Sequence, residues 1–245
     1  MQSPFDMDSE VALKRPEECA KDARRGAALI AAARSGNEEA VKEVLRLQPL
    51  ARVNAKTRDG MTALMAAAML GQAMCVKALL QYQPLAQVKA SNKNGVNALM
   101  LAVINRRGWC VRELLQHEAV AQVIATDLNG SNALMYAVQN GDLGCMELLL
   151  QHQPGVQVAA ANLDGMTALM TASVLGRDKC IRALLRHEPA MQLAAVNAQG
   201  LTAVSLAEYR VILLGSVIVC LTLASASSDG RATRANSVES MGMDW

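Results

Sequence analysis

Aromatic residues are almost absent from this sequence. Phe, Trp and Tyr together make up 2% of the 245 residues, although hydrophobic residues of all kinds make up 52%. A core with so few rings must be filled by Ala, Leu, Met and Val, which suit close-packed helices. The length allows one or two compact domains or one elongated array.

A strong charge of either sign is also missing. The chain has 24 basic and 22 acidic side chains, for a net charge of +2. This balance lacks the basic footprint of a nucleic-acid-binding protein, so we expect no nucleic-acid partner. The first residues, MQSPFDMDSEVALKRPEE, carry early acids and no apolar stretch typical of a secretory signal. We expect residues 1–14 to be disordered.

Motifs for catalysis and cofactor binding do not occur. The sequence has no glycine-rich phosphate loop, no kinase signature and no G-x-S-x-G motif. Its carboxylates are scattered, and no nucleophile is spaced with a candidate base. We therefore expect no enzyme activity, no cofactor and no metal site.

One segment is repeated along the chain. DGMTALMAAAMLG, residues 59–71, returns in recognisable form three more times. Its glycine recurs every 35 residues, at Gly60, Gly95, Gly130, Gly165 and Gly200. Self-similarity at a period between about 20 and 50 residues indicates a solenoid-type array. An upstream segment follows the same period from Arg25, and we expect it to be a degenerate first repeat that caps the array with a polar outer face. That face is predicted to consist of Glu38, Glu39, Lys42 and Glu43.

Each unit is predicted to contain two helices joined by a tight turn. We expect Thr62 to cap the first helix, with Leu64 on its apolar stripe. Gly71 marks the turn, and Val76 begins the apolar stripe of the second helix. Pro84 stops the second helix or lies just beyond it. From there we expect an extended loop to the next glycine.

The repeated segment GMTALMAAAMLG…VKALL resembles the ankyrin repeat. The signature of that family is T-P-L-H-x-A, followed by a glycine turn and a leucine-rich second helix. Here Ala replaces the Pro, Met replaces the His, and the period is 35 residues rather than 33. The resemblance covers residues 15–210. It implies an all-α, ankyrin-type helix-turn-helix solenoid of about five repeats plus a partial sixth.

The cysteines and histidines follow the same period. Four of the six cysteines are 35 residues apart: Cys75, Cys110, Cys145 and Cys180. Equivalent positions in adjacent repeats are about 8–10 Å apart, which is too far for a disulfide or a shared zinc ion. We expect buried free thiols, which favour a reducing, cytoplasmic location. The three histidines are predicted to be polar caps near the end of the second helix, with a pH-sensitive contact as the alternative. They are His117, His152 and His187.

The resemblance also implies where a partner binds. Ligands of ankyrin repeats usually meet the loop tips and the exposed inner face of the first helix. Several residues at these positions are apolar, and an exposed apolar stripe on a concave surface is typical of protein binding. We expect a protein partner oriented by Arg58, Lys93 and Asp164; alternatively, some of these side chains pack between repeats. The predicted partner-binding residues are Arg58, Asp59, Met61, Met69, Leu70, Lys93, Asn94, Val96, Ile104, Asn105, Asn129, Ser131, Gln139, Asn140, Asp164, Met166, Val174 and Leu175.

The pattern breaks in the sixth unit. In place of a turn and second helix comes VILLGSVIVCLTLASA, residues 211–226, which carries no charge. Residues 211–228 are open to three interpretations: a C-terminal cap, a membrane anchor, or a disordered tail. A transmembrane helix needs about 17–25 residues, so a membrane anchor is at the margin and not favoured. Residues 229–245 are predicted to be disordered.

Two functions follow from these patterns. The favoured hypothesis is a non-catalytic protein–protein interaction module or scaffold. The alternative is a membrane-tethered ankyrin adaptor, anchored by residues 211–228.

Overall fold

The described helices divide between two units of the chain. The computed structural model describes residues 16–47, 54–82 and 87–210. The units are Met1–Glu118 and Ala119–Trp245. The described helices of the first unit are α1 (Pro16–Ser35), α2 (Glu38–Leu47), α4 (Ala63–Leu70), α5 (Ala73–Leu80), α7 (Ala98–Ile104) and α8 (Gly108–Leu115). Those of the second are α9 (Ala119–Val123), α10 (Ala133–Asn140), α11 (Leu143–Leu150), α12 (Pro154–Ala159), α13 (Ala168–Leu175), α14 (Asp178–Leu184), α15 (Pro189–Ala194) and α16 (Ala203–Arg210).

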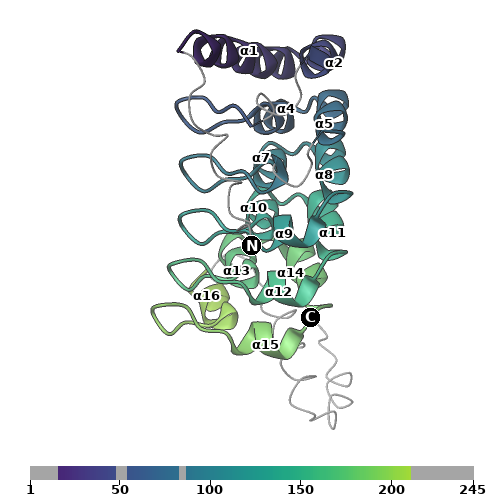
Figure 1. The fold of residues 1–245 in the computed structure, drawn as a ribbon. Coiled ribbons are helices and arrows are strands. Elements are labelled where there is room, and N and C mark those ends of the chain that lie inside the picture. Colours follow the sequence, from purple (N-terminus) through teal and green to yellow (C-terminus); the bar gives the residue numbers. More distant parts are fainter. Residues whose placement is uncertain (1–15, 48–53, 83–86, 211–245) are drawn as a thin grey trace, which may run out of the picture. The chain divides into compact units, whose positions relative to one another are not determined.

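In the first unit, helix pairs stack in two columns. The first helices of successive repeats pack on one another, α1 on α4 and α4 on α7, and the second helices follow in parallel, α2 on α5 and α5 on α8 (Figure 1). Loops project beside the column of first helices. Leu64 and Val76 are completely buried, as the predicted apolar stripes require. Each helix therefore covers its apolar face with the next repeat.

The ends of the first helices confirm the predicted signals. Thr62 Oγ1 accepts a hydrogen bond from the backbone N–H of Met65 at 3.2 Å, which caps α4. Gly71 ends α4 in the left-handed region, with φ of 83°. In the next repeat Arg106 occupies that position with φ of 56°. This left-handed conformation is energetically unfavourable for a residue with a Cβ atom.

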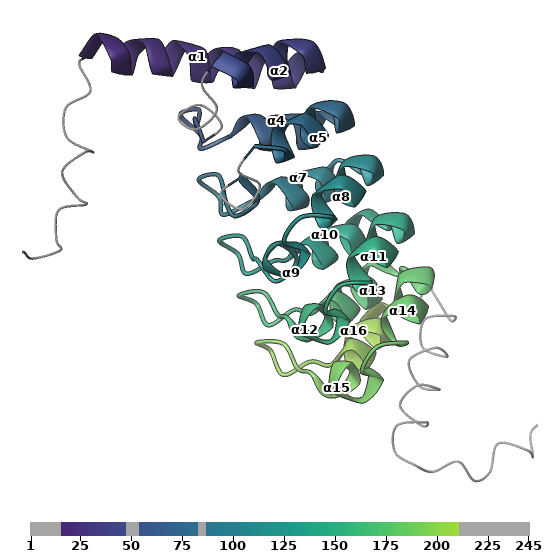
Figure 2. The ribbon, with the colours of Figure 1, turned by 45° about the vertical axis from the view of Figure 1, so that its right-hand side comes forward.

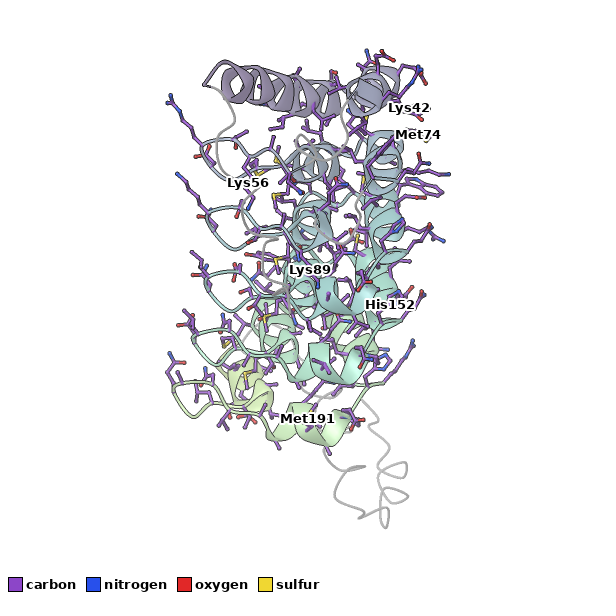
Figure 3. The ribbon with its side chains drawn as sticks, viewed as in Figure 1. Lys42, Lys56, Met74, Lys89, His152 and Met191 are labelled. Carbon is purple, nitrogen blue, oxygen red and sulfur yellow. The ribbon has the colours of Figure 1, made fainter. Side chains whose placement is uncertain are left out.

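The first repeat differs from the others. Its first helix, α1, is 20 residues long, and it runs through the register at which later repeats form a loop. Its second helix has the predicted polar outer face, where the Lys42 ammonium lies 2.7 Å from a Glu38 carboxylate oxygen and 3.2 Å from one of Glu39. Figure 3 shows Lys42 at this end of the unit.

In the second unit, a third short helix corrects the prediction of an extended loop. After each second helix the chain turns into α12 or α15, which Figure 2 shows as separate short helices. Gln153 and Glu188 turn the chain in the left-handed region, with φ of 48° and 45°. Pro154 and Pro189 follow at the start of each short helix, where their fixed φ suits the first turn. Proline here starts a third helix; Pro84 itself lies outside the described residues.

A buried glutamine explains why the third helix forms. Gln157 on α12 is completely buried, and its Nε2 donates to the Leu149 carbonyl at 2.7 Å and to the His152 carbonyl. The last carbonyls of a helix have no partner within the helix. The short helix α12 thus places the Gln157 side chain against the C-terminal end of α11, which it caps. Gln192 makes the equivalent bonds at the end of α14, with Nε2 2.7 Å from the Leu184 carbonyl oxygen.

The described chain ends in α16, which forms the partial sixth repeat. The apolar segment 211–228 lies outside the described residues, as do residues 1–14 and 229–245. Within the described ranges, no helix combines the length and the apolar character needed to cross a membrane.

Candidate protein-binding face

The loop before each first helix is a tight hairpin. In the first unit the N–H of Asn92 donates to the Val96 carbonyl at 3.0 Å, and the N–H of Gly95 donates back to the Asn92 carbonyl at 3.0 Å. Thr57, Asp127, Asn162 and Asn197 begin hairpins with the same two backbone bonds. The 35-residue period therefore presents one projecting tip per repeat from the second repeat onward.

One side chain holds each turn from within. Asp127 Oδ1 accepts from the N–H groups of Asn129 at 2.9 Å and Ser131 at 2.8 Å. Asn162 Oδ1 accepts in the same way from Asp164 and Met166. Asn and Asp favour such turns because their short side chains mimic a backbone acceptor. The exposed residues at the tips are thus carried on a fixed loop.

Within each unit, neighbouring tips are joined by a backbone hydrogen bond. In the first unit the N–H of Lys93 donates to the Asp59 carbonyl at 3.1 Å. In the second, the N–H of Leu163 donates to the Asn129 carbonyl, and that of Ala198 to the Asp164 carbonyl, both at 2.9 Å. This ladder sets the spacing of exposed side chains from tip to tip.

The C-terminal ends of the first helices supply the second part of the face. Leu70 at the end of α4 and Leu175 at the end of α13 are 38% and 37% exposed, which is high for leucine beside a packed core. Arginines from the next repeat lie over the ends of α4 and α10. The guanidinium of Arg107 donates to the Met69 carbonyl at 3.4 Å, and that of Arg177 to the Gln139 carbonyl at 3.2 Å. We call the hairpin tips and these helix ends, taken within each unit, the recognition face.

Most of the predicted partner-binding residues have exposed surface. The exposed members are Arg58, Asp59, Leu70, Lys93, Asn94, Asn129, Gln139, Asp164 and Leu175. Half-buried members are Met61, Met69, Ile104, Asn105, Asn140, Met166 and Val174. The tips also carry Leu128 and Leu163, 68% and 77% exposed, which strengthens the apolar character of the face.

Val96 and Ser131 do not fit the prediction of an exposed position. They are only 8% and 7% exposed. Each lies on the returning arm of a hairpin, where its backbone is bonded to the residue that begins the turn. These two positions shape the hairpin and offer a partner little surface.

The first unit contains a groove that the sequence did not predict. It has a volume of about 690 Å³ and lies between α1, the start of the hairpin and the end of α4. Its floor is formed by Ala27, Ile30, Ala31 and Leu70, and Arg34 and Lys56 are charged lining residues. Arg34 is 35 residues before Met69, so the repeat alignment marks it as a recognition-face position.

The periodic cysteines belong to the core, as predicted. All four are buried and free. Burial raises the pKa of the Cys110 thiol to about 11, which keeps it protonated and unreactive at neutral pH. Across the described ranges, no group of three or more His, Cys, Asp or Glu side chains is arranged to hold a metal ion.

Comparison with known families accounts for this arrangement of helix pairs and hairpins. A model described as ankyrin repeats (3 copies) matches residues 13–88, 29–127, 86–162, 116–200 and 134–227. The chain belongs to the ankyrin-repeat family. No curated protein gives a significant match.

A solved structure from Bdellovibrio bacteriovorus resembles these ankyrin repeats. It is a complex of a predatory endopeptidase with an immunity protein, and the matching chain is 28% identical in sequence with a TM-score of 0.67. The match covers 80% of this chain and 97% of that one. Ankyrin repeats generally mediate protein–protein interaction, and this neighbour is part of a complex between two proteins.

Proposed function

We propose that this ankyrin-repeat protein is a non-catalytic module that binds a protein partner on its recognition face. The observation that carries the proposal is the ladder of hydrogen-bonded hairpin tips beside exposed leucines. Fixed loops lose little conformational entropy on binding, so more of the contact energy appears as affinity. Exposed apolar residues on such a scaffold favour a protein partner.

Two further facts support a protein as the ligand. The related complex contains an endopeptidase and an immunity protein, so this repeat architecture occurs in an assembly of two proteins. The hairpin tips and helix ends of the described residues form a surface open to solvent. A small-molecule site, by contrast, usually encloses most of its ligand. A membrane-tethered adaptor remains a prediction from residues 211–228 alone.

The test compares two double variants of the full chain as bait in cell extract. The first, Leu70→Ser with Leu175→Ser, removes apolar surface from the recognition face of both units. The second, Met74→Ser with Met191→Ser, removes exposed apolar surface elsewhere, since these side chains are 56% and 41% exposed on α5 and α15. Figure 3 shows both methionines away from the hairpin tips.

We expect the first variant to lose the partners that the wild-type protein captures and the second to retain them. Unchanged circular dichroism in both variants makes the comparison one of surfaces rather than of folding. If the methionine variant loses the partners and the leucine variant keeps them, binding occurs on another face and the proposal is wrong.

A further inference from the structure

The groove of the first unit exists because the first repeat lacks a hairpin. Arg25 aligns with the hairpin glycines of later repeats, but it lies within α1. The hairpin that begins at Thr57 therefore has a helix beside it in place of a preceding hairpin. The contact is close, since a Cβ built on Gly26 would lie 2.5 Å from the Cβ of Ala55. A helix and a hairpin leave an open angle between them, and the groove occupies it.

The floor of the groove fits an apolar side chain. Ala27 and Ala31 are exposed on α1, and Leu70 is 38% exposed opposite them. Alanine side chains leave depth that a longer side chain would fill. The groove has a volume of about 690 Å³. The groove therefore has room for an inserted aliphatic side chain and the backbone on either side of it.

The charges beside the groove are positive. Arg34 and Lys56 line it from opposite elements, and both are exposed. The Lys56 ammonium donates to the Ser91 carbonyl at 3.1 Å, which holds it at the hairpin side, where Figure 3 labels it. Farther along the recognition face of this unit are the exposed cations Arg58, Lys93 and Arg107.

Acidic side chains are scarce on the same surface. Among the described hairpin and helix-end residues of the first unit, Asp59 is the single acid. Glu38 and Glu39 lie on α2 and pair there with Lys42. An approaching carboxylate thus meets cations at the groove, whereas an approaching lysine or arginine is repelled.

We propose that the groove anchors an acidic segment of the protein partner. One aliphatic side chain of the segment lies on the alanine floor, and carboxylates on either side of it pair with Arg34 and Lys56. Apolar burial supplies most of the affinity, because exposed ion pairs are individually weak. The charges select the sequence and speed the encounter. This inference rests on the proposed function and names the chemistry of the partner.

The test uses a random peptide library displayed on phage, with the full chain as the target. We expect selected peptides to combine a Leu, Ile, Val or Met with neighbouring Asp or Glu. The Kd of a labelled peptide from this selection is then measured for three variants. Arg34→Glu with Lys56→Glu reverses the groove charges. Lys77→Glu with Lys89→Glu makes the same change of net charge at exposed sites outside the groove. Ala31→Leu fills the floor.

The groove variants should raise Kd about tenfold or more, and the Lys77/Lys89 variant should leave it within about twofold. Added salt should weaken binding of the wild-type protein. A selection with no excess of acidic residues overturns the proposal, and so does a Kd that responds equally to both charge reversals. If a protein partner loses affinity when Leu175 is changed to Ser but binds Arg34→Glu with Lys56→Glu as tightly as the wild type, the groove is not its anchor. The proposed function still holds in that case.

Discussion

Substituting Ala for two hairpin glycines of the second unit distinguishes the free-energy cost of backbone strain from that of a steric clash. Gly165 and Gly200 both lie in the left-handed region, with φ of 72° and 76°. A Cβ on Gly165 would lie 2.7 Å from the backbone nitrogen of Ala198, whereas a Cβ on Gly200 meets no heavy atom of the described residues within 4 Å. Alanine at either site is strained, but only one of the two substitutions also pushes on the next hairpin.

The expected losses differ accordingly. Left-handed backbone costs a residue with a Cβ about 1–2 kcal/mol, so Gly200→Ala should lower the free energy of unfolding by that amount. Gly165→Ala adds an overlap with backbone atoms, worth about 1–3 kcal/mol by analogy with overpacked cores. It also threatens the 2.9 Å bond from the Ala198 N–H to the Asp164 carbonyl, worth about 1 kcal/mol. Gly165→Ala should therefore be the more destabilising by at least about 1 kcal/mol.

Urea unfolding followed by far-ultraviolet circular dichroism measures both losses. Amide hydrogen exchange provides a local readout: exchange of the Ala198 N–H should accelerate in Gly165→Ala and stay near wild type in Gly200→Ala. Equal losses of stability, with equal exchange at Ala198, would refute the role of hairpin stacking. Backbone strain alone would then account for both glycines.

Three further predictions concern the helix ends and the core. Arg106→Gly should raise the free energy of unfolding by about 0.5–1 kcal/mol, because glycine adopts the left-handed φ of 56° without strain. Gly141→Ala should lower the free energy of unfolding, because it introduces the same strain at the equivalent turn. Urea midpoints measure both changes. Gln157→Leu should cost about 1–3 kcal/mol, because it removes the side-chain donor of the Leu149 and His152 carbonyls, although the Leu149 carbonyl keeps the 3.0 Å bond from the His152 N–H. Gln139→Leu on the exposed surface should change the urea midpoint little. The pKa of the Cys110 thiol is raised from 9.0 to about 11, so the folded state keeps a proton that the unfolded state loses. The contribution of Cys110 to the free energy of unfolding is therefore intact below pH 9 and is lost as the pH rises towards 11. In urea titrations at a series of pH values, Cys110→Ala should make the decline of the free energy of unfolding less steep over this range.

Much of the fold was predictable because its signals are local. Thr62 and Gly71 mark the ends of a helix through their own side chain or backbone freedom, and both act as expected. The burial of Cys110 followed from its period, since equivalent positions in a stack share one environment. Neither inference required knowledge of distant contacts.

The recognition face was only partly predictable. The tips and helix ends could be located by repeat alignment, but alignment does not distinguish an exposed position from a buried one. Val96 and Ser131 align with the half-buried Met61 and Met166 and make the same backbone bonds, yet their shorter side chains leave them almost completely buried. Repeat alignment places Arg34 at the same position as Met69, but its place beside a groove depends on α1 and a hairpin lying side by side.

The period, the helix pairs and the buried stripes follow from the amino-acid sequence alone, because each depends on residues a few positions apart or one repeat apart. Tertiary structure decided the third helix, since its glutamine is explained by the helix end it caps. Tertiary structure likewise decided which repeated positions reach solvent and where the first unit opens into a groove. These features depend on how separate segments pack, and a one-dimensional pattern contains no measure of the space between them.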